Sequence, residues 1–158
     1  MDNQNLKFDF VFLGQSVLKY QVPLDIFIAI NQIYEQNYHN LNKANGQLVG
    51  KIENEHSLFY HGEDQSKMKN HNLLPKNVTD YFMSIFKHYL AFNKIRGYQT
   101  HLNSIWVNEM KQHEYNPAHI HRGMLFTGLS SVMILKMPST FGREYSAEQV
   151  QQNGRLQI

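Results

Sequence analysis

The chain of 158 residues contains no cysteine. This absence excludes a disulfide framework, a cysteine-based zinc finger and a thiol nucleophile. Any metal ion bound by this protein must therefore be held by histidine and carboxylate ligands.

Charge and long apolar runs are also scarce. Charged residues make up 18% of the chain, below the roughly 25% of ordinary soluble domains. The net charge is only +2, and the lysines and arginines form no cluster in the sequence, so we expect no nucleic-acid partner. No apolar run approaches the length that crosses a bilayer, and residues 1–5 lack the basic and apolar blocks of a signal peptide. We therefore expect no membrane partner and a cytoplasmic rather than secreted protein.

What the chain does contain is enough apolar surface for one core. Hydrophobic residues make up 42% and aromatic residues 13%, while 16 asparagines and 13 glutamines supply the polarity that charged residues do not. A length of 158 residues fits one domain. We therefore predict a single folded domain over residues 1–158.

Two helices are predicted, each beginning at a proline. Pro23 opens a helical pattern that fades between residues 42 and 46, and Pro75 opens a stronger one that ends at Gly97. Proline suits the first turn of a helix, where its missing N–H is not needed.

Strands are predicted on both sides of these helices. Residues 7–13 alternate with phenylalanine at every second position, and residues 101–110 and 131–137 contain short apolar runs bounded by turn-forming residues. Because most strands follow the helices, the pattern predicts an α+β fold in which helices come first and support a later sheet.

The chemistry of the chain points to one pair of histidines, His119 and His121. Side chains at i and i+2 of a strand lie on the same face, so two imidazoles at this spacing can bind one metal ion such as iron, zinc, copper or nickel. With nine histidines in the chain, the number of such pairs expected by chance from composition alone is about 0.5. The spacing by itself therefore leaves a second reading open, in which both histidines are exposed or structural.

The segment around this pair carries a resemblance to a known family. In order, it contains Trp106-Val107-Asn108, Tyr115-Asn116-Pro117, His119-Ile120-His121, Gly123, Ser130-Ser131, a short apolar run and Pro138. This order is similar to that of the Fe(II)/2-oxoglutarate-dependent oxygenases, and in particular of a group common in bacteriophages. The stretch 48–52 with Glu55, and the helix start at Val22-Pro23, also resemble that group.

The resemblance implies a double-stranded β-helix, a barrel similar to a jelly roll, of which residues 100–158 form the first part. Residues 1–99 then form a mainly helical or mixed support region. The implied activity is that of an oxidoreductase, a dioxygenase that uses iron and the co-substrate 2-oxoglutarate, in a phage protein that is cytoplasmic in the host or associated with the virion.

The same resemblance assigns roles to individual residues. His119 corresponds to the first Fe(II) ligand, and His121 stands where most of the superfamily has a carboxylate. Asn108 and Tyr115 correspond to positions that can face the co-substrate 2-oxoglutarate. Trp106 is expected in the core.

The family also uses a third ligand, a histidine, and a basic residue that binds 2-oxoglutarate. No histidine follows His121, and the basic candidates Arg143 and Arg155 do not follow a histidine in the family's order. We therefore expect either the N-terminal part of an enzyme or a chain whose sheet is completed by another copy or a neighbouring subunit.

Two other functions stay open. One is a non-catalytic, jelly-roll-like interaction module, associated with the virion, that keeps half of the metal site. The other is a cupin-like metal-binding protein in which His113 or Glu114 joins the histidine pair. The substrate is not indicated by any residue pattern.

Overall fold

A computed structural model of the chain describes five segments, which are residues 7–12, 16–44, 50–60, 72–117 and 128–138. The chain divides into two compact units, Met1–Asn116 and Pro117–Ile158. Each unit is described by itself, and all helices and strands below belong to the first. A single domain over residues 1–158 stays a prediction.

Both predicted helices are present and follow their prolines. Helix α1 spans Leu24–Asn37 and helix α2 spans Lys76–Phe92, with Pro23 and Pro75 at the two N-cap positions. Helix α1 ends earlier than its apolar pattern predicts, because the chain tightens into a 3-10 turn at Tyr38–Asn40 and then enters a short strand. No helix in the described segments is long and apolar enough to cross a membrane.

The N-terminal strand is confirmed as one half of a hairpin. Strand β1 (Phe8–Phe12) pairs antiparallel with β2 (Ser16–Tyr20), with Phe8 opposite Tyr20. Side chains of this hairpin contact α2, since the Tyr20 hydroxyl lies 2.7 Å from His88 Nδ1 and the Phe8 ring lies 4.9 Å from the His88 ring. These contacts fix the hairpin against the helix.

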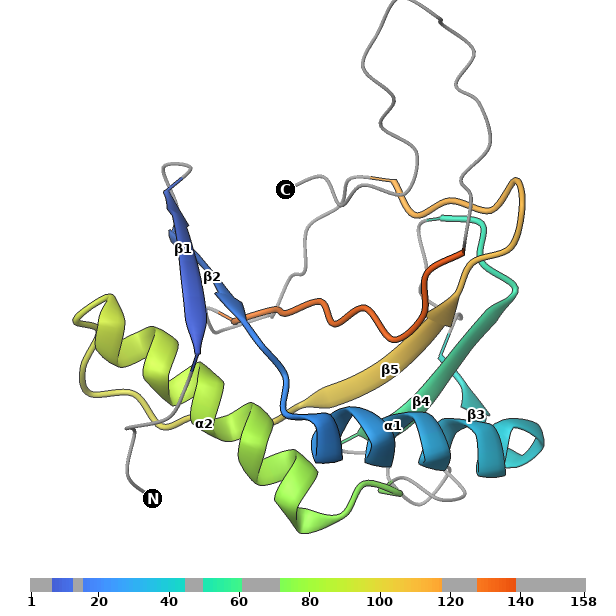
Figure 1. The fold of residues 1–158 in the computed structure, drawn as a ribbon, viewed down its shortest axis with the longest axis horizontal. Coiled ribbons are helices and arrows are strands. Elements are labelled where there is room, and N and C mark those ends of the chain that lie inside the picture. The colour runs from blue at the N-terminus through green and yellow to red at the C-terminus, as the bar shows by residue number, and fades with distance from the viewer. Residues whose placement is uncertain (1–6, 13–15, 45–49, 61–71, 118–127, 139–158) are drawn as a thin grey trace, which may run out of the picture. The chain divides into compact units, whose positions relative to one another are not determined.

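A second antiparallel sheet holds the residues of functional interest (Figure 1). It contains β3 (Asn42–Lys43), β4 (Asn54–Tyr60) and β5 (Ser104–Glu109) in the order β3-β4-β5. Ser57 lies opposite Trp106 but Phe59 lies opposite Ile105, so β4 has one more residue than β5 at this point. Leu58 is therefore the extra residue of a β-bulge.

The core of the first unit is formed by one side of each helix and by the sheet. Leu58 and Val78 are completely buried. The apolar residues that are buried around them are Ile26, Ile30, Leu41, Ile52, Leu74, Phe82 and Ile85. Their spacing on α2, at Val78, Phe82 and Ile85, is the helical spacing that the sequence pattern predicts.

Mixed helices and strands confirm the α+β class, but two finer predictions are wrong. Strands β1 and β2 precede α1, and β3 and β4 lie between the helices, so the helices do not come first. Residues 131–137 carry no strand. A short apolar run indicates a buried or extended segment. A strand also needs a hydrogen-bonded neighbouring strand, and the apolar pattern does not show whether one is present.

Candidate functional site

Strands β4 and β5 place one of the predicted co-substrate residues. Glu55 lies opposite Asn108 and Ser57 lies opposite Trp106. Because paired residues and residues two apart share a face of a sheet, these four side chains lie on one side. We call Glu55, Ser57, Trp106 and Asn108 the polar face of the sheet.

Burial differs between the two strands of the polar face. Glu55 and Ser57 on β4 are only 4% and 6% exposed, whereas Asn108 on β5 is exposed. Trp106 is 38% exposed, so its predicted place in the core is wrong. The reason is that β5 is the last strand of this sheet among the described residues, and its side chains have fewer neighbours.

Tyr115, the second predicted co-substrate residue, is fixed by its backbone. Its N–H donates to the Lys51 carbonyl at 3.1 Å, and the Lys51 N–H donates to the Tyr115 carbonyl at 2.9 Å. The Tyr115 side chain is 58% exposed. Asn108 and Tyr115 thus lie opposite Glu55 and Lys51 respectively, so one short stretch of chain positions both predicted residues.

The turn between Asn108 and Tyr115 is closed by Glu114. Its carboxylate accepts the Lys111 N–H at 2.7 Å and the Glu53 N–H at 2.9 Å. These two hydrogen bonds, first that of Lys111 and then that of Glu53, lower the pKa of the Glu114 carboxyl. His113 has a φ of 68°, a left-handed conformation typical of tight turns.

This geometry counts against the cupin-like hypothesis. Both oxygens of the Glu114 carboxylate accept backbone hydrogen bonds, so the side chain serves the turn. Among the residues that the structure describes, no three histidine, aspartate or glutamate side chains come together in a way that could hold a metal ion. His119 and His121 lie outside the described residues, and the predicted metal site depends on them.

Replacing Glu114 by glutamine is expected to loosen the turn that positions Tyr115. A glutamine side chain keeps one acceptor oxygen and places an N–H₂ group against the other backbone donor, so one hydrogen bond is lost. In Glu114→Gln we expect the amide hydrogens of Lys111 and Glu53 to exchange several-fold faster with deuterium than in wild type. The control is Glu35→Gln, at an exposed glutamate of α1, which is expected to leave both exchange rates unchanged. Unchanged exchange at both amides in Glu114→Gln would contradict the assigned role.

The opposite face of the sheet holds a histidine that the sequence analysis did not single out. His56 is 5% exposed and lies between two tyrosines of the α1 end, with ring centroids 6.0 Å from Tyr34 and 5.0 Å from Tyr38. Burial, and then the charge of Lys43, lower the pKa of His56, while Glu109 opposes this shift. His56 is therefore a buried neutral imidazole that joins α1 to the sheet.

Comparison with known proteins leaves the family open. No protein-family model, curated protein or solved structure matches this chain. The resemblance of the segment from Trp106 to Pro138 thus stands on its residues alone.

The burial of three polar residues of β4 was not predicted from the sequence. Glu55, His56 and Ser57 are consecutive and all buried, although a run of three polar residues normally indicates a surface segment. A weak signal was present, because Tyr34 and Tyr38 are spaced by one helical turn and such a pair can cover a polar partner.

Proposed function

We propose that this chain is an Fe(II)/2-oxoglutarate-dependent dioxygenase or the N-terminal part of one. The observation that carries the proposal is the common position of Asn108 and Tyr115. Both lie opposite the stretch from Lys51 to Glu55, and both precede the histidine pair in the order that the oxygenase group has. A binding strand, a turn and a metal motif in succession support this reading.

Asn108 and Tyr115 have the chemistry that a carboxylate ligand requires. The amide of Asn108 and the hydroxyl of Tyr115 are hydrogen-bond donors, and both side chains are exposed. In the proposal they bind and orient 2-oxoglutarate, and the backbone pairs of β4 with β5 and of Lys51 with Tyr115 hold them in place. Fe(II) and 2-oxoglutarate, when bound, would activate O₂, which is the oxidant.

Anaerobic titration with Fe(II) tests the metal assignment. We expect the chain to bind Fe(II) and His119→Ala to weaken this binding at least about tenfold, a loss of roughly 1.4 kcal/mol or more. His101→Ala removes an exposed histidine of the first unit and is expected to leave Fe(II) binding unchanged, which controls for general loss of imidazole.

Two results would contradict the proposal. One is Fe(II) binding that is unaffected by His119→Ala. The other is binding of 2-oxoglutarate to the Fe(II)-loaded chain that is as strong in Asn108→Ala and in Tyr115→Phe as in wild type. Succinate formation from 2-oxoglutarate by the chain would extend the proposal from binding to catalysis.

The second candidate is a non-catalytic interaction module, associated with a virion or another assembly. It is favoured by the second unit, in which Leu129, Val132, Ile134 and Met137 are between 38% and 64% exposed. Such apolar exposure is typical of a segment that binds another chain. If the chain forms a stable oligomer that binds neither Fe(II) nor 2-oxoglutarate, the interaction module is favoured over the enzyme.

A further inference from the structure

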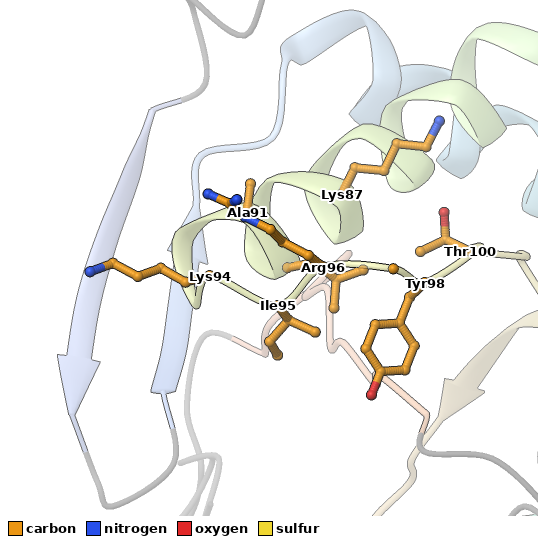
Figure 2. Close-up of a pocket in the computed structure, with 9 residues that line it drawn as sticks. Lys87, Ala91, Lys94, Ile95, Arg96, Tyr98 and Thr100 are labelled. Carbon is orange, nitrogen blue, oxygen red and sulfur yellow. The ribbon is translucent and has the colours of Figure 1, made fainter.

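Charged side chains are placed differently at the C-terminal ends of the two helices. At the end of α2, Lys87 and Lys94 line an open hollow and extend to opposite sides of the helix (Figure 2), so their charges act separately. At the end of α1, side chains converge instead on one buried imidazole, that of His56. A single change of charge at His56 therefore acts on all of them.

Residues 34–44 form one continuous segment beside the sheet, which we call the α1–β3 segment. It contains the last turn of α1, the 3-10 turn and strand β3. Strand β3 pairs with β4 over two residues, and the Ala44 N–H donates to the Glu55 carbonyl at 2.9 Å. Leu41 is the one residue of the segment that is buried. A segment held by so few contacts opens at a lower free energy than the core.

His56 faces this segment from three sides. Lys43 of β3 lies directly opposite His56, and residues that are directly opposite in an antiparallel pair have their side chains on the same face. The Tyr38 ring lies 5.0 Å from the imidazole, and the Tyr34 hydroxyl lies 3.4 Å from its Nδ1. One imidazole thus joins the strand, the turn and the helix end of the segment to β4.

The charges around His56 suit a neutral imidazole. The titratable groups that face it are Tyr34 on α1, Tyr38 on the 3-10 turn, Lys43 on β3 and Glu109 on β5. Val107, which lies opposite His56 on β5, carries no charge. Glu109 already accepts hydrogen bonds from the Tyr38 hydroxyl at 3.3 Å and the Asn54 amide at 3.2 Å. An imidazolium would lie opposite a second cation with little water around it, which disfavours the charged form.

The rest of the first unit is held independently of His56. Ile26 and Ile30, in the first half of α1, are only 5% and 3% exposed, and α2 has its own buried residues at Val78 and Phe82. Loss of the His56 contacts therefore affects the α1–β3 segment before it affects these parts of the core.

We propose that His56 is a pH-sensitive switch, in which protonation of the imidazole detaches residues 34–44 from β4 while the rest of the first unit stays folded. Detachment uncovers the backbone groups of β4 that pair with β3, so the sheet gains an open edge in acid. The switch does not depend on the proposed iron and 2-oxoglutarate sites. It differs from a loss of overall stability, because one segment opens before the core does.

Hydrogen–deuterium exchange of the full chain tests this switch at about pH 7.5 and pH 5.5, one unit on either side of the ordinary pKa of histidine. Protection factors correct for the intrinsic pH dependence of amide exchange. We expect the Ala44 amide to lose protection several-fold in acid, while the Phe82 amide in the middle of α2 stays strongly protected. In His56→Phe, the Ala44 amide is expected to be equally protected at both pH values. His39→Gln, at an exposed histidine of the same segment, is expected to behave as wild type.

Two variants keep the imidazole and change the charge around it in opposite directions. Lys43→Gln removes the opposing cation, so the acid loss of Ala44 protection is expected to be smaller than in wild type. Glu109→Gln removes the compensating carboxylate, so the same loss is expected to be larger. These variants test the switch even where His56→Phe does not fold.

Four results would overturn the switch. The first is protection of the Ala44 amide that is the same at both pH values in wild type. The second is an acid loss of this protection that persists in His56→Phe. The third is equal protection of the Ala44 and Phe82 amides at the lower pH, which would mean that the first unit opens as a whole. The fourth is a change of the acid loss in the same direction in Lys43→Gln and Glu109→Gln.

Discussion

Leu58→Ala is expected to lower the free energy of unfolding by about 3 kcal/mol, since removal of a fully buried leucine costs the transfer of its side chain and leaves a cavity. Leu58 is completely buried and is the extra residue of the bulge between β4 and β5. The sheet cannot easily close over the hole, because the Leu73 N–H is tied to the Leu58 carbonyl at 3.1 Å.

Chemical denaturation of wild type and variant measures this loss. Leu24→Ala is the matched control, because Leu24 is 70% exposed on α1 and its truncation is expected to change stability by less than about 0.5 kcal/mol. If Leu58→Ala and Leu24→Ala lower the free energy of unfolding by the same amount, Leu58 is not part of the core of the first unit.

Acidification is expected to weaken the fold through His56. Because the pKa of His56 is lowered in the folded chain, first by burial and then by Lys43, the unfolded chain binds a proton more readily. Stability is therefore full above the ordinary pKa of histidine, about 6.5, and is lost as pH falls through the interval between that value and the lowered one. Below the lowered pKa, no further loss comes from this group.

The contacts of His56 give the structural reason for this acid sensitivity. Its Nδ1 lies 3.4 Å from the Tyr34 hydroxyl, and the ring is only 5% exposed, so a charged imidazolium there would have little water around it. Lys43 adds a positive charge nearby, and Glu109, which accepts a hydrogen bond from the Tyr38 hydroxyl at 3.3 Å, compensates only in part. Protonation thus weakens the contact of α1 with the sheet.

His56→Phe tests this assignment, because phenylalanine keeps the ring contacts with Tyr34 and Tyr38 but does not titrate. We expect the denaturation midpoint of wild type to fall more steeply than that of His56→Phe between about pH 7.5 and pH 5.5, one unit on either side of the ordinary pKa of histidine. His101→Gln, at an exposed histidine, is expected to follow wild type. Equal slopes in wild type and His56→Phe would remove His56 as the cause.

The helices show what kind of feature could be predicted. Pro23 and Pro75 marked two helix starts, and the apolar spacing of Val78, Phe82 and Ile85 marked the buried side of α2. These are local properties, since a fixed proline φ and a repeat of 3.6 residues act within one turn of chain. The end of α1 at Asn37 was not predicted, because an apolar pattern continues after it.

The candidate site divides in the same way. Asn108 and Tyr115 were selected from their order in the chain, but only the pairing with Glu55 and Lys51 brings them to one stretch of backbone. Trp106 was expected in the core and is exposed, because whether a strand is covered depends on its neighbours. The pairing partners on β4 and β5 lie more than forty residues apart in sequence, and no local pattern predicts which residues pair.

The absence of cysteine, known from the sequence alone, limits any metal site in this protein to histidine and carboxylate ligands. The sequence likewise determined the two helices and the first strand, because these follow from local dihedral preferences and apolar spacing. Only the tertiary structure decided that Glu114 closes a turn and that His56 is buried beneath two tyrosines. Burial, hydrogen-bond partners and local charge are properties of neighbours in space, which the order of residues does not contain.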